Sequence, residues 1–317
     1  MAGRIRDEDV AHVKERADLA EVIGEVVTLR PAGGGNLKGL CPFHDEKSPS
    51  FSVRPSVGYY HCFGCGESGD AITFLMRIDH LSFAEAVERL AGRAGVQLRY
   101  EEGGVTSGRQ PGQRTRLIEA HRHAAQFYAE QLSTPAAQAG RQFLAERGFD
   151  QAAAEHFGVG FAPKDWDSLV RHLRGLGFSP EELVAAGLAS LGQRGPIDRF
   201  KGRLLWPIRD IGGEVVGFGA RRLFDDDRIE AKYVNTPETA LYKKSQVLYG
   251  VDLAKREIAR RMQAVVVEGY TDVMACHLAG VGTAVATCGT AFGDEHIKIL
   301  RRLLMDQNEF RGEVVFT

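Results

Sequence analysis

The sequence has no long apolar run, no paired cysteine framework and no strong excess of either charge. No segment approaches the roughly 20 apolar residues that a membrane helix needs. The start of the chain is too rich in Asp, Glu, Arg and Lys to resemble a secretion signal. Five cysteines do not pair evenly, which argues against an extracellular disulfide scaffold and favours a reducing cytoplasm.

The near-neutral charge also limits the function classes. A net charge of −2 gives no global attraction to nucleic acid, so any such function must rest on local basic patches. A Gly-x₄-Gly-Lys-Ser/Thr loop is missing from the sequence, which disfavours a motor ATPase. The 317 residues, 44% hydrophobic and 26% charged, are ordinary for a globular protein of about two or three domains.

Two short cysteine and histidine pairs are the most specific feature that is present. Cys41 and His44 have two residues between them, as do Cys62 and Cys65, and seventeen residues separate the pairs. Three thiolates and one imidazole suit a tetrahedral Zn²⁺ ion that is structural, because no coordination position stays open. The alternative ligand is His61, which we disfavour because neighbouring residues of a strand point to opposite faces.

Residues 1–100 are predicted to form one zinc-ribbon domain. We expect a helix over residues 7–23, a glycine turn between strands at 26–30 and 37–40, and paired strands at 51–54 and 57–62 that carry the metal turns. Asp70 is positioned to cap a helix, and Ser82 with Glu85 forms a capping box for another that ends near Gly95. Residues 101–115 contain four glycines and one proline, which is typical of a flexible linker.

The remainder of the chain is predicted to be a mixed α+β subdomain followed by a partial α/β sheet. Residues 116–185 are mostly helical in pattern, and strands are expected at 204–208, 214–218 and 232–234. The apolar run at 264–267 is typical of a buried parallel strand. A helix at 270–279, a strand at 283–287, a helix at 294–304 and a strand at 313–316 complete a parallel sheet that is cut short.

Five segments together resemble the bacterial replicative DNA primases of the DnaG type. They are GLCPFHDEKSPSF at 39–51, CFGCG at 62–66, RFKGRLLWPI at 199–208, KYVNTPE at 232–238 and VEGYTDV at 267–273. The resemblance implies a zinc-binding domain, an N-terminal polymerase subdomain at 116–260 and the start of a TOPRIM domain at 261–317. It implies a DNA-directed RNA polymerase that joins ribonucleoside triphosphates on single-stranded DNA.

The resemblance also implies roles for two acidic residues. Glu268 follows a buried strand at the carboxyl edge where open α/β sheets hold their sites. It corresponds to the TOPRIM glutamate, a ligand for Mg²⁺ or Mn²⁺ or a general base. Asp272 belongs to the same motif, but in the first helical turn it could act on the helix dipole alone. A solvated carboxylate is the alternative for Glu268.

Basic residues with neighbouring rings and amides form the expected contacts to nucleic acid or nucleotide. The alternating Arg199, Lys201 and Arg203 are expected on one face of a strand. The full set of candidates is Lys47, Arg54, Arg199, Lys201, Arg203, Arg221, Lys232, Tyr233 and Asn235. A basic groove with an aromatic platform suits a single strand, whereas the alternative is a charged face that only aids solubility.

The resemblance makes this chain an N-terminal fragment, expected to be inactive alone. Family members continue past this point with an Asp-x-Asp motif and with a C-terminal domain that contacts the replicative helicase. We expect a monomer without membrane contact. Two other hypotheses are a non-catalytic zinc-ribbon protein that binds single-stranded DNA, and the primase part of a phage-like primase–helicase.

Overall fold

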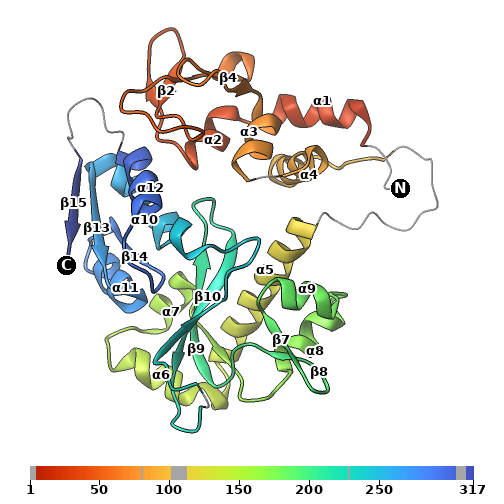
Figure 1. The fold of residues 1–317 in the computed structure, drawn as a ribbon, viewed down its shortest axis with the longest axis vertical. Coiled ribbons are helices and arrows are strands. Elements are labelled where there is room, and N and C mark those ends of the chain that lie inside the picture. The colour runs from red at the N-terminus through yellow and green to blue at the C-terminus, as the bar shows by residue number, and fades with distance from the viewer. Residues whose placement is uncertain (1–4, 80, 101–112, 228, 305–311) are drawn as a thin grey trace. The chain divides into compact units, whose positions relative to one another are not determined.

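The computed structural model describes residues 5–79, 81–100, 113–227, 229–304 and 312–317. Two compact units make up the chain, one mainly from Met1–Gly112 and the other mainly from Gln113–Ile258 with Gln263–Ile297. Figure 1 shows the course of the chain through its helices and strands. None of the helices in the described segments combines the length and the apolar character needed to span a bilayer.

Within the described residues, the first unit contains a five-stranded antiparallel sheet, in agreement with the predicted zinc ribbon. The strands follow one another in the order β1-β2-β3-β4-β5. Phe51 and Tyr60 stack in its core at 5.1 Å, and both are fully buried with Phe74. The elements are α1 (Asp7–Arg16), α2 (Leu19–Gly24), β1 (Arg30–Pro31), β2 (Leu37–Gly39), β3 (Phe51–Arg54), β4 (Tyr59–Cys62), β5 (Ser68–Gly69), α3 (Ala71–Ile78) and α4 (Phe83–Ala94), with a 3₁₀ turn at Pro55–Val57.

Local signals explain where these helices begin and where a predicted helix boundary was wrong. Asp70 caps α3 by accepting from the Thr73 N–H, and Ser82 and Glu85 form the predicted capping box of α4. The single helix expected over residues 7–23 is two helices. Asp18 breaks it, because its carboxylate accepts from the N–H groups of Ala20 and Glu21 and so starts α2. The strand expected over residues 26–30 was also wrong, since only Arg30 of that range lies in a strand. The N–H groups of Val26 and Val27 bond instead to the Ile23 carbonyl in a turn after α2.

The second unit begins with helix α5 (Gln113–Leu132). This helix contains the last three residues of the predicted linker, whose residues 101–112 lie outside the described segments. Helix α5 packs on a four-stranded antiparallel sheet of order β11-β10-β9-β6, and a hairpin of β7 and β8 is separate from it. The elements are α6 (Gln138–Ala145), α7 (Gln151–Phe157), β6 (Gly160–Ala162), α8 (Ser168–Gly175), α9 (Pro180–Ala185), β7 (Ala189–Gly192), β8 (Gly195–Asp198), β9 (Arg203–Arg209), β10 (Val215–Arg222) and β11 (Tyr233–Asn235), with a 3₁₀ turn at Pro135–Ala137.

A second four-stranded sheet, of order β12-β14-β13-β15, forms the partial α/β layer. Strands β13 and β14 are parallel, and β12 runs antiparallel to β14. The continuous apolar run of β13 is buried from Ala264 to Val267, as expected for a central strand. The elements are β12 (Leu248–Tyr249), α10 (Val251–Arg261), β13 (Gln263–Val267), α11 (Tyr270–Leu278), β14 (Ala284–Thr287), α12 (Asp294–Leu304) and β15 (Glu313–Phe316), after a 3₁₀ turn at Lys244–Gln246.

Candidate functional site

The four side chains predicted to bind zinc converge in the first unit. One ligand atom from each of Cys41, His44, Cys62 and Cys65 lies within 4.8 Å of all the others. The Sγ atoms of Cys41 and Cys65 are 3.8 Å apart, and Cys62 Sγ lies 3.8 Å from His44 Nδ1. A tetrahedron with Zn–S bonds of about 2.3 Å has edges of roughly 3.8 Å, so the cluster has the size of a zinc site.

A cation beside Cys41 would change the charge state of its buried thiol. Burial raises the pKa of the Cys41 thiol, which therefore favours its neutral form unless a cation lies beside it. A bound Zn²⁺ supplies that charge and holds the sulfur as thiolate. The alternative ligand His61 packs edge-on against Phe63, with ring centroids 4.7 Å apart. The residues present thus fit a structural Cys₃His zinc site.

Glu46 and Ser50 hold the ligands in place, and sequence reasoning missed both. Glu46 accepts from the backbone N–H of Cys41 at 2.6 Å, and its other carboxylate oxygen lies 3.3 Å from His44 Nε2. Ser50 donates to Glu46 through its hydroxyl, which lies 3.2 Å from Cys62 Sγ. Such partners fix the tautomer of a ligating histidine and orient the sulfur atoms. Their only sequence signal is their place between the ligand pairs.

The two glycines beside Cys65 serve different purposes. Gly66 adopts a positive φ of 79°, a backbone conformation that favours glycine, in the turn after Cys65. Gly64 does not need a left-handed backbone. A Cβ atom there would lie 2.6 Å from His44 Nε2, so this glycine is required for the close approach of the imidazole.

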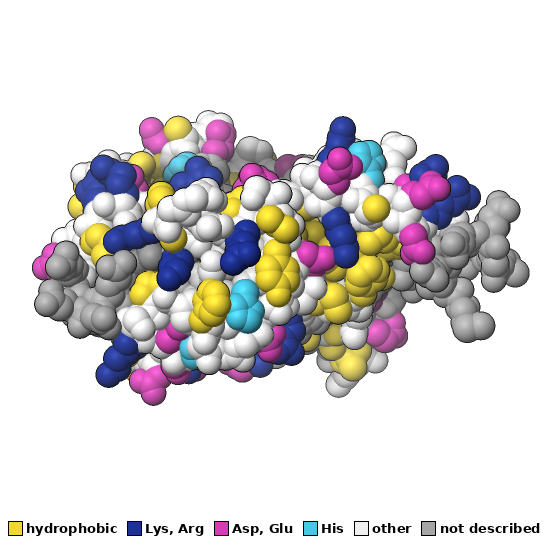
Figure 2. All heavy atoms as spheres, turned by 90° about the horizontal axis from the view of Figure 1, so that it is seen from above, with side chains coloured by type: hydrophobic (Ala, Val, Ile, Leu, Met, Phe, Trp, Pro, Cys, Tyr) yellow, Lys and Arg dark blue, Asp and Glu magenta, His cyan; other side chains and the backbone are white. Residues whose placement is uncertain are grey.

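One face of the ribbon sheet carries cations and rings in register. A cross-strand row contains Arg30, Lys38, Ser52, His61 and Ser68. In the next row the exposed Arg54 pairs with Tyr59, which is 41% exposed. Paired residues of neighbouring strands point to the same side of a sheet, so these groups share a face. Seen from above, basic side chains are interspersed with hydrophobic and histidine side chains (Figure 2). The candidate Lys47 is exposed in the loop before β3.

Glu268 lies where the sequence predicted it, at the carboxyl end of β13. It is exposed, and helix α11 begins two residues later. Asp272, the second predicted catalytic residue, accepts from the Gly269 backbone N–H at 3.0 Å. This bond is a helix cap that fixes the turn after Glu268. The geometry thus favours a local structural role for Asp272, the alternative that its position in the first turn had left open.

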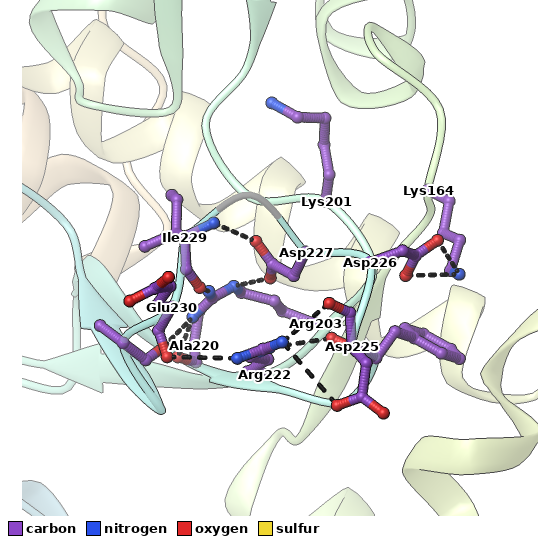
Figure 3. A network of polar contacts seen from close by, with 12 residues as sticks. Lys164, Lys201, Arg203, Ala220, Arg222, Asp225, Asp226, Asp227, Ile229 and Glu230 are labelled. Carbon is purple, nitrogen blue, oxygen red and sulfur yellow. Dashed lines mark hydrogen bonds and ion pairs between the residues drawn. The ribbon is translucent and has the colours of Figure 1, made fainter.

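The prediction that Arg199, Lys201 and Arg203 share one strand face is wrong. Strand β9 starts only at Arg203, after a turn in which Gly202 has a φ of 62°. The guanidinium of Arg203 is 2% exposed and lies 2.6 Å from Asp227. It also donates to the carbonyls of Ile229 and Ala231 (Figure 3). Arg203 therefore organises the loop between β10 and β11 and offers no surface contact.

The acidic run in that loop is paired with cations from other elements. Asp227 pairs with Arg203, Asp226 lies 3.0 Å from Lys164, and Arg222 donates to the Asp225 carbonyl at 2.8 Å (Figure 3). The carboxylates of Asp226 and Asp227 are therefore paired with Lys164 and Arg203.

A pocket of about 380 Å³ opens beside this network. Its lining includes Arg199, Lys201, Phe224 and the half-exposed Trp166. The ammonium of Lys201 lies 5.0 Å from the centre of the Trp166 ring and also donates to the Asp198 carbonyl. Trp166 was missed by sequence reasoning, because an isolated tryptophan carries no spacing signal. The pocket combines positive charge with a stacking surface.

A neighbouring pocket of about 260 Å³ is lined by Arg221, Arg222 and Lys232, among others. Arg221 lies 4.0 Å from the centre of the Phe143 ring and 5.6 Å from that of Tyr233. Tyr233 is 38% exposed, and Lys232 is exposed beside it. Strands β10 and β11 therefore bring three of the predicted contact residues together.

Asn235 differs from the other candidates because protein groups occupy its amide. Its Nδ2 donates to the Cys288 carbonyl at 2.7 Å, and its Oδ1 accepts from the Tyr270 hydroxyl at 2.9 Å. The predicted contact of this side chain with nucleic acid is therefore not supported by its position.

Comparison with known proteins matches three family models to successive parts of the chain. Family models match the CHC2 zinc finger at residues 5–106, the N-terminal domain of the DNA primase catalytic core at 127–255 and a Toprim domain at 262–316. The DNA primase of Streptomyces coelicolor is 69% identical over 318 residues, which are 100% of this chain and 49% of that protein. The chain therefore spans about half the length of the curated relatives that it matches.

Two solved structures extend the likeness to three dimensions. The RNA polymerase domain of Mycobacterium tuberculosis primase DnaG, in complex with a double-stranded DNA oligomer with a 6-nucleotide overhang, is 66% identical with a TM-score of 0.62. The match covers 64% of this chain and 63% of that one. The zinc-binding and RNA polymerase domains of the Aquifex aeolicus primase are 31% identical with a TM-score of 0.58, over 96% of this chain and 70% of that one. With its zinc ribbon, its primase core and its Toprim sheet in this order, the chain belongs to the DnaG-type DNA primase family.

Proposed function

We propose that this chain forms the template-recognition and nucleotide-joining region of a DNA primase. The reaction is synthesis of short RNA primers from ribonucleoside triphosphates on single-stranded DNA for chromosomal replication. The observation that carries this proposal is the exposed Glu268 at the carboxyl edge of the Toprim sheet. Open α/β sheets place their reactive groups at this edge.

Glu268 is proposed to hold a divalent cation. Carboxylate oxygens are the ligands that Mg²⁺ prefers, and Mn²⁺ accepts the same donors. A divalent ion held there would lower the pKa of the attacking 3′-hydroxyl and balance charge on the departing pyrophosphate. The backbone around Glu268 is fixed on its C-terminal side, since Asp272 binds the Gly269 N–H. The chain thereby supplies one oriented carboxylate without rearrangement.

The basic pockets of the second unit are proposed to hold the template or the incoming nucleotide. Arg199 and Lys201 line one pocket, and Arg221 and Lys232 line the other, so each pocket offers cations that attract a phosphate group. Trp166 and Tyr233 offer exposed rings on which bases stack. The relative from M. tuberculosis, solved with DNA, supports DNA as the partner.

The zinc ribbon is proposed to contact the template separately. Positive charge comes from Lys47, from Arg54 and from the cross-strand row of the ribbon sheet described above. Tyr59 supplies an aromatic ring. We infer domains at residues 1–100, 116–260 and 261–317 from the sequence pattern, although strand β12, which precedes residue 261, pairs with β14 of the Toprim sheet. A cytoplasmic location, and a helicase contact through residues beyond this chain, are part of the same proposal.

Substitution of Glu268 tests the function. In the full-length protein, Glu268→Gln should lower template-directed primer synthesis by more than about 100-fold, because it removes a direct ligand where even supporting residues contribute 10–100-fold. Binding of single-stranded DNA should be nearly unchanged. The matched control is Glu181→Gln, an exposed carboxylate on α9, which should retain synthesis. Full synthesis by the Glu268 variant would exclude this centre and favour a DNA-binding scaffold.

A further inference from the structure

Asn235 joins the two loops that follow the parallel strands of the Toprim sheet. Tyr270, two residues after Glu268, donates its hydroxyl to Asn235 Oδ1 at 2.9 Å. Cys288, which directly follows β14, accepts from Asn235 Nδ2 at 2.7 Å. We call this set of Asn235, Tyr270 and Cys288 the Asn235 bridge. It ties strand β11 of one sheet to the carboxyl edge of the other.

The neighbouring sheet is shaped to receive the Tyr270 side chain. Asn235 is the register partner of Gly219 on strand β10. A Cβ atom at Gly219 would lie 2.2 Å from the Tyr270 hydroxyl, so only glycine leaves room for the phenol. The Tyr270 ring also stacks on Trp206, with centroids 5.5 Å apart and planes within 9°. Trp206 is fully buried, which makes this platform rigid.

We propose that Asn235 is a positioning residue for Glu268 and does not contact the nucleic acid. This inference rests on the proposed primase function. The Tyr270 hydroxyl donates to Asn235 and so holds the turn after Glu268 to strand β11. Asp272, in helix α11, accepts from the Gly269 N–H of the same turn. Glu268 therefore leaves β13 into a turn that is held at two points. The exposed carboxylate thus has a backbone with little freedom to shift.

The chemistry of the asparagine amide explains why this residue type suits the position. One side chain must accept from a hydroxyl and donate to a carbonyl at the same time, which an amide does and a carboxylate does not. Buried polar groups that lose a partner must rearrange or remain unsatisfied. Displacement of a catalytic group by about 1 Å costs on the order of 100-fold in rate. Through the Asn235 bridge, a shift of strand β11 would therefore displace the turn after Glu268.

Two variants of the full-length protein test this role. Asn235→Ala should lower kcat for primer synthesis by about 100-fold, with the KM for nucleotides and the affinity for single-stranded DNA little changed. Tyr270→Phe keeps the stack on Trp206 and removes only the hydroxyl, and it should lower kcat by roughly 10-fold on the same argument. The control is Tyr249→Phe, because the Tyr249 ring packs perpendicular to Tyr270 at 4.7 Å and its hydroxyl has no hydrogen-bond partner in the described segments. Tyr249→Phe should retain the parent kcat.

The double variant supplies the decisive comparison. If the bridge acts as a unit, adding Asn235→Ala to Tyr270→Phe should cost much less than Asn235→Ala alone. Hydrogen exchange should also rise in both segments, 268–272 and 288–290, in either single variant of the 317-residue chain. A raised nucleotide KM or weaker DNA binding with an unchanged kcat would overturn the proposal, as would a fully active Tyr270→Phe. Failure of the proposed function is distinct, since the Glu268→Gln variant would then synthesise primers like the parent.

Discussion

A buried histidine, His121, couples the stability of the second unit to pH. His121 on α5 is 0% exposed, and its Nδ1 lies 2.8 Å from the Leu117 carbonyl, which can only accept. Its ring stacks on Phe218 with centroids 6.0 Å apart. Burial lowers the pKa of His121 to about 4. The native state therefore excludes the charged form, whereas the unfolded chain binds a proton near pH 6.5.

The sign of the resulting pH dependence follows from proton linkage. The unfolded state binds more protons between the two pKa values, so the contribution of His121 is fully present above about pH 6.5 and is lost as pH falls toward 4. Between pH 7 and pH 5 the loss amounts to about 2 kcal/mol of unfolding free energy. Urea unfolding at pH 7 and at pH 5 should measure this loss of unfolding free energy. The loss should disappear in the His121→Gln variant.

The comparison of variant with parent is essential, because Asp198 acts in the opposite direction. Burial raises the pKa of Asp198 to about 6, so its contribution favours the native state at low pH. His156→Gln, at an exposed site on α7, is the control and should keep the parent pH dependence. An unchanged dependence in His121→Gln would show that another group is responsible.

Residue roles were predictable from the sequence only where their partners are local. The zinc ligands could be identified because the two members of each pair lie within four residues of sequence. Arg203 could not, because its partner Asp227 lies 24 residues away and no spacing links them. The partners of Asn235 are 35 and 53 residues away. A cation or amide in a motif therefore shows which interactions the side chain can make. Its tertiary contacts decide which of them it makes.

At the scale of elements, local patterns predicted most helices and strands because their determinants are short-range. The capping residues Asp70 and Ser82 and the apolar run of β13 acted as expected. Several boundaries were wrong, and two of them have identifiable reasons. Asp18 competes with helix continuation by capping the next helix, and Gly202 turns the chain just before β9.

The zinc ribbon should depend on its metal. Cys41 and Cys62 lie within the hydrophobic cluster of the first unit, beside Phe51 and Tyr60. Structural zinc contributes roughly 10–16 kcal/mol in small finger peptides, which is more than a ribbon of this size gains from its core. We expect Cys62→Ser to release zinc and to unfold residues 25–65, while the second unit stays folded. Zinc content and limited proteolysis measure both effects.

A second cysteine of the chain provides the control for this experiment. Cys276 on α11 is half-buried and lies outside the ligand cluster, so Cys276→Ser should retain zinc and its proteolysis pattern. Stoichiometric zinc in Cys62→Ser with an unchanged digest would refute the ligand set. Zinc should also be lost as pH falls, because protons compete for the thiolates and the imidazole.

At the scale of the whole molecule, net charge is a poor guide to nucleic-acid binding. The chain carries 40 basic and 42 acidic residues, yet basic groups gather in the two pockets of the second unit. Acidic side chains near these pockets are partly neutralised by Lys164 and Arg203. Binding of single-stranded DNA should thus be weak and salt-dependent, with about three to five phosphates neutralised and log K falling by about 0.7 per contact with log salt.

Removal of the pocket cations should flatten this salt dependence. In the triple variant Arg199→Gln, Lys201→Gln and Lys232→Gln, the slope of log K against log salt should become shallower by about 2, because each lost phosphate contact removes roughly 0.7. The contribution of the zinc ribbon should remain. Fluorescence anisotropy with a labelled single strand at several salt concentrations measures the slope and the affinity together.

A charge-matched control separates local contacts from global electrostatics. Arg171, Arg174 and Arg256 are exposed on helices of the same unit and line neither of the two basic pockets. Replacing these three by Gln changes the net charge by the same amount, so any long-range effect is equal in both triple variants. Only the pocket variant should show a shallower slope of log K against log salt. Equal losses in the two variants would mean that the DNA responds to total charge, and the path of the template would then lie outside these pockets.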